Sequence, residues 1–346
     1  MSRRDRQRAE LVALCRTGPV ARSVDLAFGH LAEFGPDDDL LDRMEEALEG
    51  RCVSAADRRR FDELRHSTGT GRSERRARCC VSGVSSRRME VDMGQLGYDS
   101  AGAGDPALLF LHGWCGDRSF FAPQFDYFAP THRVVSVDLP GHGESEVPEE
   151  YSIEAFASRV SELATELELG RSVVFGHSIG AMVALALSQS APELVCAVAL
   201  IDPPPLSKDV WKSFAPQLIS SFTGPDGPTG RRQFVEQMFL PTDDRARRAK
   251  IIETMTAVPN DIAIPSVEAI AAFDAMAVLR ECNVPVLTIS SAVPTNEAAS
   301  LLEANATMTL GQTVGAGHFL QLEVPEQVNP MIERFLATIP GGSLAA

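Results

Sequence analysis

Short apolar runs alternate with helical patterns over most of the chain. The runs lie at residues 107–111, 134–137, 173–175, 197–201, 286–289 and 308–314. Near-continuous apolar runs of this length are typical of strands buried on both faces of a parallel sheet. Residues 89–98 alternate instead, as an antiparallel strand pair would. The pattern predicts an open, mostly parallel α/β sheet.

Helical spacing fills the gaps between these strands. Ile153, Phe156, Val160 and Leu163 recur at steps of three and four, and Ser152 precedes them as a candidate N-cap. Residues 181–190 are strongly apolar, as suits a helix packed against a sheet. An amphipathic pattern over 324–339 predicts a closing helix.

Residues 203–283 interrupt the alternation, because about eighty residues pass without a strand pattern. Helices are expected at 210–222, 231–239, 245–256 and 266–279. We interpret this insertion as a helical cap over the strand ends. The core domain would then comprise residues 89–202 and 284–346.

The first 88 residues differ from the rest. Residues 1–66 read as a helical N-terminal extension, and residues 67–88, rich in Arg, Ser and Gly, as a flexible linker. The extension could be a small interaction module, or it could be dispensable for chemistry, with translation beginning naturally at Met89. The linker and extension carry 18 Lys and Arg against 15 Asp and Glu, whereas residues 89–346 carry 14 against 32.

Composition narrows the partners and the compartment. The acidic body gives no support for nucleic-acid binding and favours small neutral or cationic substrates. No apolar run is long enough for a membrane span, and the N-terminus lacks a secretory pattern. The seven cysteines have no zinc-site spacing and fit free thiols. We therefore expect a cytoplasmic protein without metal, nucleic-acid or membrane partners; its oligomeric state stays open.

Ser178 carries the clearest chemical signal. It stands in Gly176-His177-Ser178-Ile179-Gly180, after an expected strand and before an expected helix. A sharp strand-turn-helix bend exposes a serine hydroxyl as a nucleophile, and flanking glycines relieve crowding in the turn. The N–H of Ile179 would then face the developing oxyanion. The loop at His112-Gly113-Trp114 would offer the Trp114 N–H as the second donor.

His318 is the candidate general base. It lies in Gly315-Ala316-Gly317-His318-Phe319, between the last expected strand and the last helix. A loop there can bring the imidazole over the strand ends toward Ser178, and histidine ordinarily titrates near neutral pH. His112 and His142 are interpreted as structural residues.

Together these motifs, with residues 138–145 (Asp-Leu-Pro-Gly-His-Gly-Glu-Ser), resemble the α/β-hydrolase superfamily over residues 89–339. The resemblance implies an eight-stranded, mostly parallel sheet, a helical cap after strand six, and Ser-acid-His catalysis without a cofactor. The family usually places its acid after strand seven, where residues 290–297 contain only Glu297. Asp202, at the end of strand six, is the preferred acid, Glu297 is the alternative, and a chain without a functional acid is the third possibility.

The expected activity is hydrolysis of a carboxylic ester, lactone or thioester of a small, largely apolar molecule. Candidate substrate contacts are Trp114, His177, Phe214 and Phe319. Hydrolysis of an activated C–C bond uses the same groups and remains open. A small-molecule sensor with weak or no turnover is the alternative class, because the acid is not in its usual loop.

Overall fold

The computed structural model describes residues 96–339. The expectations for the extension at 1–66, the linker at 67–88 and the strand pattern up to residue 95 lie outside these residues. Within them, a single sheet takes the order β1-β3-β2-β4-β5-β6-β7. Only β1 runs antiparallel to its neighbour; the other pairs are parallel. The strands are β1 Tyr98–Ala101, β2 Ala107–Leu111, β3 Val134–Val137, β4 Ser172–His177, β5 Val195–Ile201, β6 Val286–Ser290 and β7 Thr309–Gln312.

The expected eight-stranded sheet therefore has seven strands in the described part of the chain. The alternation over 89–98 suggested a strand pair; residues 89–95 lie outside the described residues, and β1, which begins at Tyr98, pairs antiparallel with β3. Strand β1 ends after Ala101, because Gly102 and Gly104 have positive φ angles of 70° and 130° and turn the chain toward β2. The mostly parallel α/β character is confirmed.

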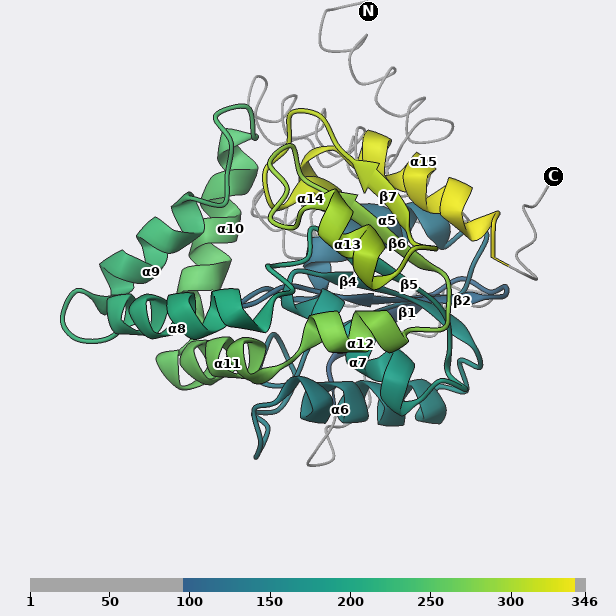
Figure 1. Cartoon of the computed structure of the whole chain (residues 1–346), viewed down its shortest axis with the longest axis horizontal. Helices are drawn as coiled ribbons and strands as arrows, with labels where there is room; N and C mark the ends of the chain where they lie inside the picture. Colours follow the sequence, from purple (N-terminus) through teal and green to yellow (C-terminus); the bar gives the residue numbers. More distant parts are fainter. Residues whose placement is uncertain (1–95, 340–346) are drawn as a thin grey trace, which may run out of the picture. The chain divides into compact units, whose positions relative to one another are not determined.

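Alternating strand residues build two apolar layers. In β2, Leu109 and Leu111 belong to one buried cluster, whereas Leu108 and Phe110 belong to the other. Helices α6 and α7 contribute to the first cluster, and α5 and α15 to the second, so helices cover both faces of the sheet (Figure 1). These helices are α5 Ala122–Phe128, α6 Ile153–Glu166, α7 Ile179–Ser190 and α15 Pro325–Leu336. Ser152 caps α6 as expected, since its side chain accepts a hydrogen bond from Ala155 N.

The cap lies between β5 and β6, and its helices stand beside the sheet in Figure 1. It comprises α8 Lys208–Phe222, α9 Gly227–Glu236, α10 Arg245–Ala257 and α11 Asn260–Ala272. The helix expected at 266–279 is two helices, because the Asp274 side chain accepts from Ala277 N and starts α12 Ala275–Glu281. Helix α12 packs on α7, so it joins the layer that flanks the sheet.

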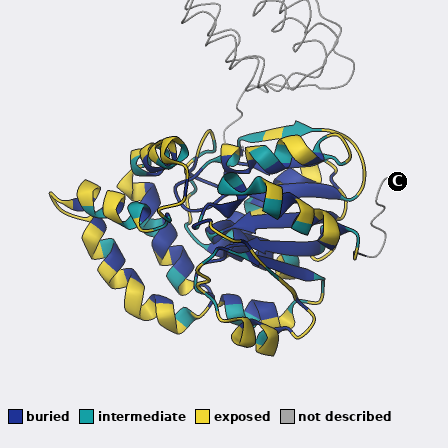
Figure 2. Cartoon of the chain, turned by 90° about the horizontal axis from the view of Figure 1, so that it is seen from above, coloured by how far each residue is buried: buried dark blue, intermediate teal, exposed yellow. Residues whose placement is uncertain are grey.

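Burial follows the same layering. Figure 2 shows the central strands buried, while the cap helices carry both buried and exposed residues. Between residues 96 and 339, no single helix has the length and apolar content of a membrane span; only α11 and α12 together reach them, and they meet at a 52° bend. The remaining short elements are η1 Arg118–Phe121, α13 Ala298–Ala304 and α14 Leu320–Glu323.

Candidate active site

Ser178 stands on a strained turn between β4 and α7. Its φ of 54° and ψ of −121° lie in a region that residues with a Cβ rarely adopt. A Cβ on Gly176 would come within 2.1 Å of Gly180 O, and one on Gly180 within 2.3 Å of Leu111 O. Both glycines are therefore required by close backbone approach. The turn leaves Ser178 partly exposed while its neighbours are buried.

Two backbone N–H groups near this turn have no hydrogen-bond partner within residues 96–339. Ile179 is the first residue of α7, so its N–H has no partner inside the helix. Trp114 follows the end of β2 in the loop beside Ser178, where a Cβ on Gly113 would lie 3.1 Å from Ser178 Cβ. Neither N–H donates a hydrogen bond within residues 96–339. Both are free to bind an anionic oxygen.

His318 and Asp202 are hydrogen-bonded to each other. Nδ1 of His318 lies 2.7 Å from Asp202 Oδ2. A carboxylate can only accept, so Nδ1 carries the hydrogen and Nε2 is left able to accept a proton. The other carboxylate oxygen, Oδ1, accepts from Ser291 N at 2.7 Å. Asp202 itself takes a positive φ of 38° at the end of β5, which turns its side chain off the strand.

Glu297, the alternative acid, lies apart from this pair. It is exposed at the start of α13 and makes no hydrogen bond or ion pair with His318 among the described residues. The loop after β6 instead serves Asp202, through the N–H of Ser291. The hydroxyl of Ser178 makes no hydrogen bond in residues 96–339. In ligand-free enzymes, the hydrogen bond between a nucleophile and its base is often long and forms fully only when substrate binds.

His177 is buried against His318. Its Nε2 lies 2.9 Å from the His318 carbonyl oxygen, which can only accept, so Nε2 donates. Nδ1 is then unprotonated, buried and without a partner. Burial, followed by the neighbouring His318, lowers the pKa of His177 well below its ordinary value. His177 is therefore a neutral ring that holds the backbone of the histidine loop.

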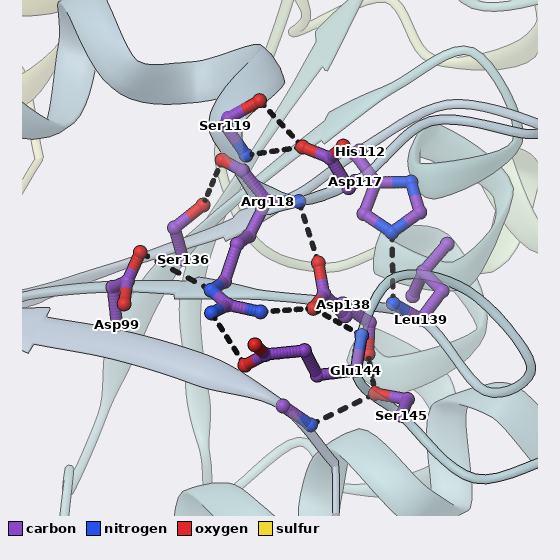
Figure 3. Close-up of polar contacts among 11 residues, drawn as sticks. Asp99, His112, Asp117, Arg118, Ser119, Ser136, Asp138, Leu139, Glu144 and Ser145 are labelled. Atoms are coloured by element: carbon purple, nitrogen blue, oxygen red, sulfur yellow. Dashed lines mark hydrogen bonds and ion pairs between the residues drawn. The ribbon is translucent and has the colours of Figure 1, made fainter. Parts of the chain in front are cut away.

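A polar cluster joins the end of β2, at His112, to the end of β3 and the residues that follow it (Figure 3). His112 Nε2 accepts from Leu139 N at 2.9 Å, and His112 Nδ1 donates to Gly113 O at 2.7 Å. Asp138, at the end of β3, binds the Arg118 backbone N–H, the Arg118 guanidinium and the Glu144 N–H. Residues 138–145 thus act as a structural brace; sequence reasoning missed Arg118, which no motif marked.

The aromatic candidates lie mainly in packing positions. The Trp114 indole is only 5% exposed, donates to Ala263 O in α11 at 2.8 Å and stacks on Phe222 in α8. Phe319 is fully buried and stacks on Phe239. Phe214 remains 40% exposed beside Trp211 and Phe234. Substrate contact by these side chains stays a prediction.

A cavity of about 520 Å³ opens elsewhere. Residues around Pro285 line it, and Pro285 directly precedes β6. Ser178 follows the end of β4, which runs parallel to its neighbours, so this cavity lies at the opposite edge of the sheet. None of the candidate site residues lines this cavity.

Comparison with known proteins gives one family. A model described as the alpha/beta hydrolase family matches residues 108–331. The chain is 35% identical over 115 residues to the dihydrolipoyllysine-residue acetyltransferase component of the acetoin cleaving system of Cupriavidus necator, which covers 33% of this chain and 31% of that protein. It is 31% identical over 132 residues to the pimeloyl-acyl-carrier protein methyl ester esterase of Yersinia pseudotuberculosis, which covers 38% and 50%. The match spans a third to a half of these relatives.

Solved structures agree on the fold. The enol-lactonase from Burkholderia xenovorans superposes with a TM-score of 0.62 at 23% identity, over 70% of this chain and 96% of that one. A thermophilic esterase from Thermogutta terrifontis gives a TM-score of 0.62 at 22% identity, over 70% and 93%. At these identities the likeness concerns the arrangement of strands and helices.

Proposed function

Since the chain belongs to the alpha/beta hydrolase family, we propose that it is a serine hydrolase that cleaves a carboxylic ester, lactone or thioester through an acyl-enzyme on Ser178. The observation that carries the proposal is the 2.7 Å contact between His318 Nδ1 and Asp202 Oδ2, at the edge of the sheet where Ser178 stands on its turn. The family relation supports a hydrolase; the bond cleaved is our inference.

In the first half-reaction, Ser178 Oγ attacks the substrate carbonyl carbon while His318 Nε2 takes the hydroxyl proton. Asp202 holds the Nδ1–H tautomer and stabilises the imidazolium that forms. The N–H groups of Trp114 and Ile179 bind the tetrahedral oxyanion, each contributing about 3 kcal/mol. His318 then gives its proton to the departing oxygen or sulfur, which leaves the acyl group on Ser178.

In the second half-reaction, water attacks the acyl carbonyl. His318 Nε2 accepts a proton from this water, the same two N–H groups bind the oxyanion, and the proton returns to Ser178 Oγ as the carboxylic acid departs. Apart from this water, the proposed steps use only side chains and backbone of this chain and need no cofactor.

The proposed substrate is small and largely apolar. The cap faces the Trp114 loop with aromatic rings: Phe222 and Phe234 pack on Trp114, and the partly exposed Phe214 packs on Phe234. A lining of this kind favours an acyl or aryl group over a charged one. The methyl ester esterase of Yersinia pseudotuberculosis named above supports an ester as the bond cleaved and leaves the substrate of this chain open.

Labelling with a fluorophosphonate probe tests the proposal, with Ser178→Ala as the control. We expect the wild-type protein to be labelled and to turn over members of a panel of esters, lactones and thioesters, and the variant to do neither. A panel member with an activated C–C bond distinguishes the related hydrolase class. Absence of both labelling and turnover in the wild type would support the sensor alternative, which the Asp202 contact makes less favourable.

A further inference from the structure

The cap contributes a short segment, residues 238–243 between α9 and α10, that lies against the loop carrying His318. We call it the cap strap. His318 N donates to Met238 O at 2.9 Å. Gly317 N donates to Asp243 Oδ1 at 3.1 Å, and Thr242 Oγ1 donates to Gly315 O at 2.9 Å. Three hydrogen bonds thus join the strap to three residues of the histidine loop, Gly315, Gly317 and His318.

Asp243 is the centre of this contact. It is 5% exposed and forms no ion pair with a cationic side chain in residues 96–339. Its second oxygen, Oδ2, accepts from Leu240 N at 2.8 Å, within the strap itself. A buried carboxylate without a cation is costly unless its oxygens are hydrogen-bonded. Here the carboxylate bridges the turn of the strap and the backbone of the histidine loop with charge-assisted bonds.

Gly317 fits this close approach. A Cβ at this position would lie 2.6 Å from Asp243 Oδ2 and 2.6 Å from Met238 O. Such contacts are shorter than any Cβ tolerates, so either the strap or the loop would have to move. The close approach of the strap therefore requires a glycine immediately before His318. Residues Gly315-Ala316-Gly317-His318 form the surface on which the cap packs.

Further contacts fasten the same two segments. Phe239 stacks on Phe319 with ring centroids 5.0 Å apart. Beyond the strap, Asp244 N and Arg247 Nη1 both donate to Glu323 Oε2, at 3.0 and 2.6 Å. The cap is thus attached on both sides of His318 along the chain.

His318 is consequently held at its backbone N–H, its carbonyl oxygen and its Nδ1, while Nε2 stays available. The strap binds its N–H, His177 binds its carbonyl oxygen, and Asp202 binds its ring. We propose that Asp243 is a positioning residue that fixes the general base through Gly317, so that the seating of the cap and the geometry of the base are coupled. The inference rests on the proposed role of His318.

Asp243→Ala tests the coupling in the full-length protein, with Asp226→Ala as the control. Asp226 is an exposed cap residue without a side-chain capping bond. We expect kcat of Asp243→Ala to fall about 100-fold, the cost of misplacing a catalytic group by about 1 Å. KM should change less than about threefold, because no substrate contact is removed. The kcat of Asp243→Asn, which keeps one acceptor oxygen, should lie between those of the wild type and Asp243→Ala.

Amide hydrogen exchange gives a readout that needs no turnover. In Asp243→Ala the amides of Gly317 and His318 should exchange faster than in the wild type and in Asp226→Ala. If Asp243→Ala does not fold, Thr242→Val serves as the test variant, because it removes only the exposed hydrogen bond from Thr242 Oγ1 to Gly315 O. Its kcat should be about fivefold lower than that of the wild type. Unchanged kcat and unchanged exchange in the folded variants would overturn the inference, as would a rise in KM with kcat intact.

Failure of the proposed function would look different. His318→Ala would then leave turnover intact, or the wild type would show none, while the exchange of the Gly317 and His318 amides would still report whether Asp243 holds the loop. An active wild type inactivated by His318→Ala, together with an Asp243→Ala variant matching the control, would retain the function and reject the strap.

Discussion

At the scale of residues, hydrogen bonds from neighbouring residues fix the position of the His318 ring. Nδ1 of His318 is bound to Asp202, whose second oxygen is bound to Ser291 N, so the ring has one tautomer and one orientation. His177 is held neutral by burial and donates to the His318 carbonyl. Nε2 of His318 and the hydroxyl of Ser178 have no hydrogen bond within residues 96–339 and are available for chemistry.

Substitution of the two candidate acids distinguishes them. Asp202→Asn should lower kcat by about 10⁴, because a neutral amide favours the wrong imidazole tautomer and cannot stabilise the imidazolium. Glu297→Gln makes the same change from carboxylate to amide at an exposed position, so it should change kcat less than twofold. Steady-state kinetics of both variants on one ester decide the question, and the reverse order of effects would reject Asp202.

At the scale of elements, the ends of neighbouring strands build the site and the cap braces it. β4 ends before Ser178, β5 ends before Asp202, and β6 leads to Ser291, and these strands are adjacent in the sheet. From the cap, α11 receives the Trp114 indole N–H and α8 stacks on its ring. The cap therefore contacts both the loop of Trp114, the proposed oxyanion donor, and the loop of His318, the proposed base.

Trp114→Phe tests the first of these contacts. The variant keeps the backbone N–H proposed for the oxyanion but removes the indole hydrogen bond to the carbonyl oxygen of Ala263. We expect a loss of about 1–3 kcal/mol in unfolding free energy and a change in kcat of less than tenfold. Urea unfolding and kinetics measure the two quantities. A loss of activity with unchanged stability would instead assign the indole to substrate binding.

At the scale of the molecule, the buried histidines link stability to pH. Burial lowers the pKa of both His112 and His142 to about 4. An unfolded chain protonates histidine near pH 6.5, so below that value the unfolded state binds more protons than the folded state. The contribution of these two neutral histidines to the unfolding free energy is thus fully present above pH 6.5 and is lost as the pH falls toward about 4.

Urea unfolding between pH 7 and 5 measures this dependence. Each histidine should remove at most about 1.4 kcal/mol of unfolding free energy per pH unit in that window. His142→Gln should reduce the slope by the share of one histidine. A stability that is constant between pH 7 and 5 would show that these rings take up protons in the folded protein as readily as in the unfolded chain.

The local pattern of the sequence determined the elements, the parallel sheet, the Ser178 turn and the glycine-flanked His318, because periodicity and turn chemistry act within a few residues. It joined α11 to α12, because the capping side chain of Asp274 outweighs helical spacing. The family resemblance implied eight strands, and residues 96–339 contain seven. The sequence preferred Asp202 to Glu297 without deciding between them. Only the tertiary structure decided which carboxylate reaches His318, 116 positions away, and that Asp243 supports the same loop, because such contacts depend on the order of strands and the seating of the cap.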